Sequence, residues 1–248
     1  MFGEKNGTSK VIRLGGRMIE LLYFTGPPKG MIVDLFRMSI LQDSNTFALA
    51  SAAKEMTEDK YRKSLKASGR KLLVSSLFCN RMAMQAAGST VGHMWAKIAA
   101  YHFVSGVISL SGKRPMPLHE LEQSRGIQTT SGTIAEGLGA ALECIGLERA
   151  TRPAISRSLD ALAELKSVDY DRDLVLSKIN FLLDRQKLTD CYFYIGRIAA
   201  DNLAKRGDSF HRRYGKLVQL ALDLTSDMQQ MEKLQRSLFN ASSSILKS

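Results

Sequence analysis

The sequence predicts an all-α protein with two helical subdomains joined by a linker, ending in a long heptad-patterned helix. Apolar residues recur at spacings of three and four through most of the chain, and no segment shows a convincing period of two. Only 5 of the 248 residues are prolines, which suits long helices. A chain of this length can bury a core as one large domain or as two smaller ones.

The first subdomain is expected to cover residues 1–112. Apolar spacing over 11–22 predicts a short helix, which a Gly-Gly pair weakens. A Gly-Pro-Pro segment within 25–30 predicts a turn, because a proline cannot continue a helix interior. Further helices are expected over 32–40 and 44–56.

The next helix is expected to begin at Thr57, a hydroxyl cap followed by two acidic residues at the positive end of the helix dipole. Its inward stripe is predicted to be Tyr61, Leu65, Ser68 and Leu72. No Asp or Glu occurs between Lys60 and His119, whereas ten Lys or Arg do. Solvated helices normally carry both signs, so this pattern favours an anion-binding face. Its candidate residues are Lys60, Arg62, Lys63, Lys66, Arg70 and Lys71.

The basic character is local to the first half. The net charge is +11, and residues 1–126 hold 18 basic and 9 acidic side chains, against 17 and 15 in residues 127–248. Such an asymmetry is typical of a binding surface for an anionic partner. Smaller basic groups that extend the candidate surface are Lys113, Arg114, Arg212 and Arg213.

Residues 74–110 are expected to form two helices that are apolar on most sides. A small-residue ridge at Gly88, Gly92 and Ala96 would let a neighbouring backbone approach closely. Lys97 divides the apolar run into parts shorter than the roughly 20 residues that span a bilayer, so we expect core helices. Isolated histidines in this region are expected to be core residues.

The linker is predicted over 113–132, and the second subdomain over 133–248. A capping box at Thr133 begins a helix that Gly146 can close, and Pro153 suits the first turn of the next helix. Two further helices are expected over 172–188 and 190–206.

The last predicted element is one helix with a heptad seam from Phe210 to Leu238, capped by Asp208. The seam either lies across its own domain or pairs with another chain. In the second case it would mediate self-association through Phe210, Tyr214, Leu217, Leu224, Met228 and Met231.

The sequence contains no local motif for catalysis or metal binding. Cys79, Cys144 and Cys191 are widely spaced and odd in number, which favours a reducing compartment over a disulfide framework. The sequence has no C-x-x-C or H-x-x-x-H pair, no phosphate-binding loop and no nucleophile turn. We therefore expect no catalytic residue, metal or cofactor.

Two classes of function fit these observations. The first is a non-enzymatic, self-associating structural protein that coats an anionic membrane surface from within a reducing compartment. The alternative is a nucleic-acid-binding helical protein, such as a nucleocapsid protein or a regulator. Against the alternative, the basic helix has Tyr61 as its only nearby aromatic residue, whereas base-stacking surfaces interleave several. A third possibility is a scaffold subunit that meets an acidic protein.

Two short segments, Pro28-Lys29-Gly30-Met31-Ile32 and Tyr61-Arg62-Lys63-Ser64-Leu65-Lys66, together with the chain length, the 11 methionines and the basic first half, resemble the matrix proteins of orthomyxoviruses. That resemblance implies a two-part helical protein that polymerises under a viral envelope and contacts ribonucleoprotein. The Cys/His cluster of that family has no counterpart in this sequence.

Overall fold

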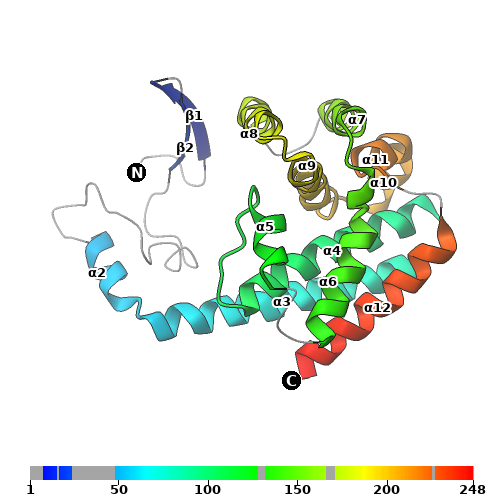
Figure 1. Cartoon of the computed structure of the whole chain (residues 1–248), viewed down its shortest axis with the longest axis horizontal. Coiled ribbons are helices and arrows are strands. Elements are labelled where there is room, and N and C mark those ends of the chain that lie inside the picture. Colours follow the sequence, from blue (N-terminus) through cyan, green and yellow to red (C-terminus); the bar gives the residue numbers. More distant parts are fainter. Residues whose placement is uncertain are drawn as a thin grey trace. The chain divides into compact units, whose positions relative to one another are not determined.

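The protein is described from a computed structural model. The chain forms two compact units, Met1–Ala67 and Ser68–Ser248. Figure 1 draws their elements. The structure describes residues 8–15, 17–23, 48–127, 132–165, 171–224 and 227–247. The turn expected within 25–30 and the helix expected over 32–40 lie outside these ranges.

The first unit contains an antiparallel β-hairpin where a short helix was predicted. β1 (Thr8–Leu14) pairs with β2 (Arg17–Tyr23). Gly15, in the connection, has a φ of 54°, a left-handed conformation that glycine adopts without steric cost. A Gly-Gly loop of two residues is a hairpin signal, and it overrides the apolar spacing of the flanking residues. The helical prediction over 11–22 was therefore wrong.

The helices that follow begin close to the predicted positions. α2 (Ala48–Glu55) is the alanine-rich helix, and α3 (Glu58–Gln85) continues unbroken from the first unit into the second. Thr57 accepts a hydrogen bond from the amide of Lys60 at 3.3 Å, as expected of the cap. Every described element after β2 is a helix, which confirms the all-α class for the bulk of the chain.

α4 (Thr90–Leu110) lies at the centre of the second unit. Its N-cap is Ser89, whose side chain accepts a hydrogen bond from the amide of Gly92 at 3.1 Å. Of its 21 residues, 17 are buried, so the helix is covered on all sides. It packs against helices from most of the chain: α5 (Glu120–Arg125), α6 (Gly132–Ile145), α9 (Leu188–Leu203), α11 (Gly215–Ala221) and α12 (Met228–Lys247).

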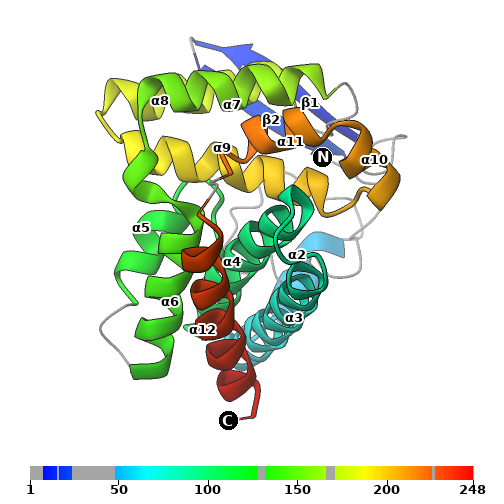
Figure 2. The same ribbon diagram turned by 90° about the vertical axis from the view of Figure 1, so that its right-hand side faces the viewer.

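The second unit has two layers, seen in both Figure 1 and Figure 2. The later part of α3 lies with α4, α6 and α12 in the lower layer, and α9 and α11 lie in the upper layer. The upper layer also contains α7 (Arg152–Glu164), α8 (Arg172–Asp184) and α10 (Asp208–Arg213), and a 3-10 turn, η1 (Leu147–Arg149), connects α6 to it.

Several predicted helix boundaries are confirmed. Gly146 ends α6 in a left-handed conformation, with a φ of 79°. Pro153 lies in the first turn of α7, where its missing amide is not needed, and Thr151 caps that helix by accepting from Ala154. These signals depend on neighbouring residues only, which is why the sequence reveals them.

The backbones of α3 and α4 approach closely at one pair of glycines. A Cβ atom on Gly69 would lie 2.8 Å from the carbonyl oxygen of Gly106, too close for any real side chain. Further along the same contact, Ser76 Oγ donates a hydrogen bond to the Ala99 carbonyl at 2.8 Å. Of the predicted small-residue ridge, Gly92 does allow a close backbone approach, because a Cβ atom there would lie 2.9 Å from the carbonyl carbon of Ala86, whereas Gly88 is exposed in the turn before α4.

The inward face of α3 also differs from the predicted stripe. Leu65 is buried, but Ser68 is exposed, and the fully buried position is Leu73 in place of the predicted Leu72, which is half-buried. The Gly69 contact sets this rotation of the helix, because α4 packs beside that residue.

The predicted single helix from Phe210 to Leu238 is divided among three helices, so that part of the prediction was wrong. α10 ends before Tyr214, and the chain turns again after α11 at Asp223, which has a φ of 46°. A long final helix is confirmed, but it begins at Met228. Asp208 is not the cap: it lies in the first turn of α10, after Gly207.

The compact units divide the chain at residue 67, whereas the predicted linker covers 113–132. Part of that linker is ordered as α5, which packs against α4 and α9. The apolar surface of α4 is covered by helices from both sides of the linker, so one core extends across it.

Candidate anion-binding surface

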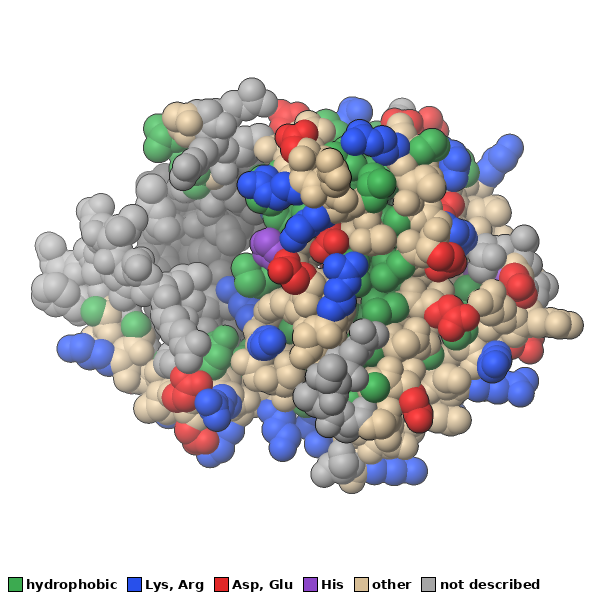
Figure 3. Space-filling model, in the orientation of Figure 1, with side chains coloured by type: hydrophobic (Ala, Val, Ile, Leu, Met, Phe, Trp, Pro, Cys, Tyr) green, Lys and Arg blue, Asp and Glu red, His purple; other side chains and the backbone are tan. Residues whose placement is uncertain are grey.

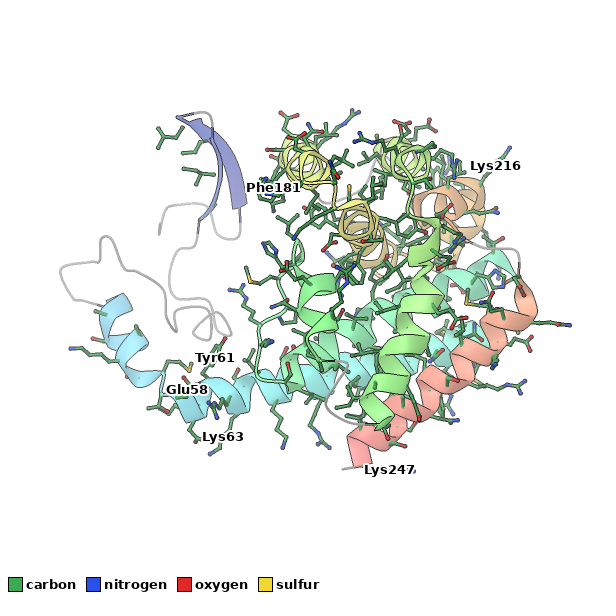
Figure 4. The ribbon with its side chains drawn as sticks, viewed as in Figure 1. Glu58, Tyr61, Lys63, Phe181, Lys216 and Lys247 are labelled. Carbon is green, nitrogen blue, oxygen red and sulfur yellow. The ribbon has the colours of Figure 1, made fainter. Side chains whose placement is uncertain are left out.

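In the first unit, the predicted basic residues of α3 are exposed but partly neutralised. Arg62 Nε lies 3.0 Å from a carboxylate oxygen of Glu58, and Lys63 Nζ lies 2.7 Å from one of Asp59. Figure 4 labels Glu58 and Lys63 on these first turns. The hydrogen bond to Asp59 raises the pKa of Lys63.

Lys60, in the same turns, donates to the backbone carbonyl of Glu55 at 3.0 Å, and Lys66 is exposed. The two acidic residues that predicted the start of the helix therefore also offset part of its charge. This reduces the number of cations that the first turns offer to an external anion.

In the second unit, α3 exposes a stripe of cations and apolar side chains together. We call Arg70, Lys71, Val74, Phe78 and Arg81 the outer face of α3. All five are exposed, and Val74 and Phe78 keep 55% and 61% of their surface accessible. At 3.6 residues per turn, spacings of three, four and seven place them within an arc of roughly 100°. The opposite side of the helix is buried through Leu73, Ser76, Cys79, Asn80 and Ala83.

The cations of the outer face have few partners within the described part of the chain. Arg70 Nη2 donates to the Leu246 carbonyl at 2.7 Å, at the C-terminal end of α12. Neither Lys71 nor Arg81 forms an ion pair with another described residue, and no acidic residue occurs on α3 after Asp59. Figure 3 shows Lys and Arg side chains along the lower edge of the molecule, where Figure 1 draws α3 and the end of α12.

The sequence reasoning missed the apolar part of this face. Val74 and Phe78 were included in a segment expected to be core on most sides. Their spacing from Arg70, Lys71 and Arg81 was the available signal, because residues three, four and seven apart share a helix face.

One of the ten cations is not on the surface at all. Lys97 is 1% exposed, and its ammonium group donates to the Leu222 and Asp223 carbonyls and to Tyr192 Oη at 3.3 Å. Tyr192 in turn donates to an Asp223 carboxylate oxygen at 2.8 Å. Burial lowers the pKa of Lys97 to about 7, with a smaller contribution from Arg149. This lysine fixes the chain reversal between α11 and α12.

A second basic group comes from α10 and the residues next to its two ends, where aromatic rings accompany the cations. The guanidinium of Arg206 lies 5.4 Å from the ring centre of Phe210, and that of Arg213 lies 5.4 Å from the ring centre of Tyr214. Arg212 is exposed beside them.

A third, smaller group is Lys113 and Arg114, which are exposed after α4. Gln123 of α5 donates to the Arg114 carbonyl at 2.9 Å and accepts from the Met116 amide at 3.0 Å, which ties this segment to α5. The exposed cations of the second unit that were predicted as candidates thus come from three stretches of the chain: α3, the residues after α4, and α10.

Five of the six residues predicted for self-association pack within the chain. Met231 is buried, and its sulfur lies 3.5 Å from Cys144 Sγ. A further four are half-buried against the same core: Phe210, Tyr214, Leu217 and Leu224. The sixth predicted residue, Met228, is the first residue of α12.

The cysteine side chains lie inside the core of the second unit. The three cysteines are free and buried, and burial raises the pKa of each thiol to about 12. Among the described residues no group of three or more His, Cys, Asp or Glu side chains is placed to hold a metal ion. None of the described helices is both long enough and apolar enough to cross a bilayer.

Comparisons of the chain with protein-family models, with curated proteins and with solved structures found no match.

Proposed function

We propose that this chain is a non-enzymatic, self-associating structural protein that attaches to an anionic membrane surface. The observation that carries the proposal is the outer face of α3, where exposed cations and exposed apolar side chains lie on one helical stripe. A helix face of this composition is typical of proteins that lie on anionic lipid.

The charges support attachment that depends on salt and on the number of copies. Each Lys or Arg near an anionic leaflet contributes about 1 kcal/mol, so the cations Arg70, Lys71 and Arg81 give weak attachment to a single chain. Linked copies multiply the effect, because later contacts form at a high effective concentration. Self-association is therefore part of the proposal, through surfaces other than the seam residues that pack against the core.

The resemblance to orthomyxovirus matrix proteins supports the same location, peripheral to a membrane or within a virion, and a possible ribonucleoprotein partner. Of the two segments that carry it, Tyr61–Lys66 lies in the first turns of α3. The segment 28–32 lies outside the described residues.

The test is flotation of the purified, nuclease-treated protein with neutral or phosphatidylserine-rich liposomes, at low and high salt. We expect stronger flotation with the anionic liposomes than with the neutral ones, and a reduction of that difference by salt. The double variant Lys71→Glu/Arg81→Glu should bind at least about tenfold more weakly, since two attractive charges become repulsive.

The matched control is Arg152→Glu/Arg172→Glu, which changes the net charge equally. Both arginines are exposed in the first turns of α7 and α8, where an acidic residue suits the helix dipole. Equal flotation of the two double variants, or no flotation of the natural sequence, would refute the proposal.

A second candidate function, binding of single-stranded nucleic acid, is favoured by the basic group on α10. Arg206, just before α10, and Arg213, at its end, lie over the rings of Phe210 and Tyr214, and the first turns of α3 lack this combination of cations and aromatic rings. Fluorescence anisotropy with a labelled single-stranded RNA measures this directly. Arg212→Glu/Arg213→Glu should abolish binding if α10 is the site, and binding that survives the change would place it elsewhere.

A further inference from the structure

Val74 and Phe78 are unusual because they are large apolar side chains exposed in the middle of a well-packed helix. The same turns of α3 bury Leu73 completely and Cys79 to 4% exposure. The helix is therefore fixed to the core by its inner side, and its outer face cannot turn inward to cover the two apolar residues. Val74 and Phe78 are therefore held on the surface of the folded protein, where a binding partner can contact them.

The charges around these two residues indicate the chemistry of that partner. Arg70 and Lys71 precede Val74 by a turn, and Arg81 follows Phe78 by a turn. Long basic side chains can extend their charged ends away from an apolar contact while their stems lie along it. An apolar centre with cations at both ends matches the boundary between acyl chains and phosphate groups of a bilayer.

The length of the stripe suits the same partner. The segment from Arg70 to Arg81 rises about 17 Å at 1.5 Å per residue, and it carries no acidic side chain. Phe78 is the one aromatic residue of this face, whereas a surface that stacks the bases of a single-stranded nucleic acid has several aromatic rings. An aliphatic residue beside that ring contributes little to base stacking but contributes fully to burial in lipid.

We propose that the outer face of α3 inserts Val74 and Phe78 into the acyl boundary of an anionic bilayer, while Arg70, Lys71 and Arg81 bind lipid phosphates. This inference rests on the proposed membrane attachment and adds to it an apolar contribution that salt does not screen. Binding should consequently have two parts, one reduced by high salt and one that persists.

The experiment compares the natural sequence with Val74→Ser/Phe78→Ser in flotation with phosphatidylserine-rich liposomes. At low salt the variant should still float, through its cations, but at least about tenfold more weakly, since two apolar side chains no longer leave water. At high salt the natural sequence should retain measurable binding and the variant should retain none.

The control variant Leu220→Ser/Phe239→Ser also removes two exposed apolar side chains, which lie on α11 and α12 and are 40% and 37% exposed. It should bind like the natural sequence. If Val74→Ser/Phe78→Ser binds as strongly as the natural sequence at both salt concentrations, the proposed insertion is wrong, although the proposed membrane attachment stands. If the natural sequence binds no liposome, both proposals fail.

A second measurement reports insertion without depending on affinity. Phe78→Trp places an indole on the outer face, and its fluorescence should be quenched by liposomes whose acyl chains carry bromine. Phe181→Trp, at another exposed phenylalanine on α8, should show no added quenching. Equal quenching of the two variants would overturn the assignment of α3 as the inserted element.

Discussion

Replacing Lys97 by Met tests whether the buried amine is neutral in the folded protein. Burial lowers its folded-state pKa to about 7, from an ordinary value of 10.5. Between these two values the unfolded chain binds one more proton than the folded chain, so the free energy of unfolding rises with pH. Below about pH 7 both states are protonated, and this dependence disappears.

The magnitude follows from proton linkage. One proton of difference changes the free energy of unfolding by about 1.4 kcal/mol per pH unit, which amounts to about 2 to 3 kcal/mol between roughly pH 7.5 and 9.5. Met has a similar length and no proton to lose, so the stability of the natural sequence relative to Lys97→Met should increase by that amount. Other titrating groups are common to both proteins and largely cancel in the difference.

The assay is urea unfolding of both proteins, followed by far-UV circular dichroism at several pH values. Lys97→Met also leaves the Leu222 and Asp223 carbonyls without this donor, at a cost of about 1 to 3 kcal/mol for each unsatisfied group, which does not itself change with pH. A stability difference that stays constant from pH 7.5 to 9.5 would show that the folded amine remains charged. Burial would then not lower the pKa of Lys97 in the folded protein.

Further predictions concern the packing and the buried charges of the second unit. In α6, Gly137→Ala should destabilise the protein by about 1 to 3 kcal/mol, because a Cβ there would lie 2.8 Å from that of Ala241. Gly139→Ala, two residues away with open space around it, should instead stabilise by about 0.5 to 1 kcal/mol in the same denaturation assay. Arg197→Met should cost about 3 to 5 kcal/mol, since it leaves the buried Glu120 carboxylate, 3.6 Å from the guanidinium, without its cation. Adding Glu120→Gln should recover part of that loss in a double-mutant cycle, and strict additivity of the two changes would contradict the pairing.

The parts of this fold that the sequence predicts are those that neighbouring residues determine. The start of α3 is an example, because the Thr57 hydroxyl and two adjacent acidic residues together specify a helix N-terminus. The left-handed end of α6 at Gly146 is another. In the hairpin, a local signal was present in the two glycines but was weighed less than the apolar spacing.

The parts that the sequence did not predict depend on distant contacts. The heptad pattern after Phe210 is real, yet the chain reverses after α11, where carbonyl groups bind the ammonium of Lys97, 125 residues from Leu222 along the chain. That same lysine is one of the ten cations between Lys60 and His119, and nothing in the sequence indicates its partners. The exposure of Phe78 likewise depends on which side of α3 packs against α4. The spacing of apolar residues along α3 does not by itself predict which side is buried.

The burial of α4 on all sides has a consequence for how the protein can be observed. An amide in its central turns reaches water only when the surrounding helices separate, so its hydrogen should exchange at a rate set by global unfolding. Amides in exposed helix ends should exchange through local fraying. The slowest-exchanging peptides of α4 would therefore report the stability of the second unit on any surface to which the protein binds, without a label and without denaturant.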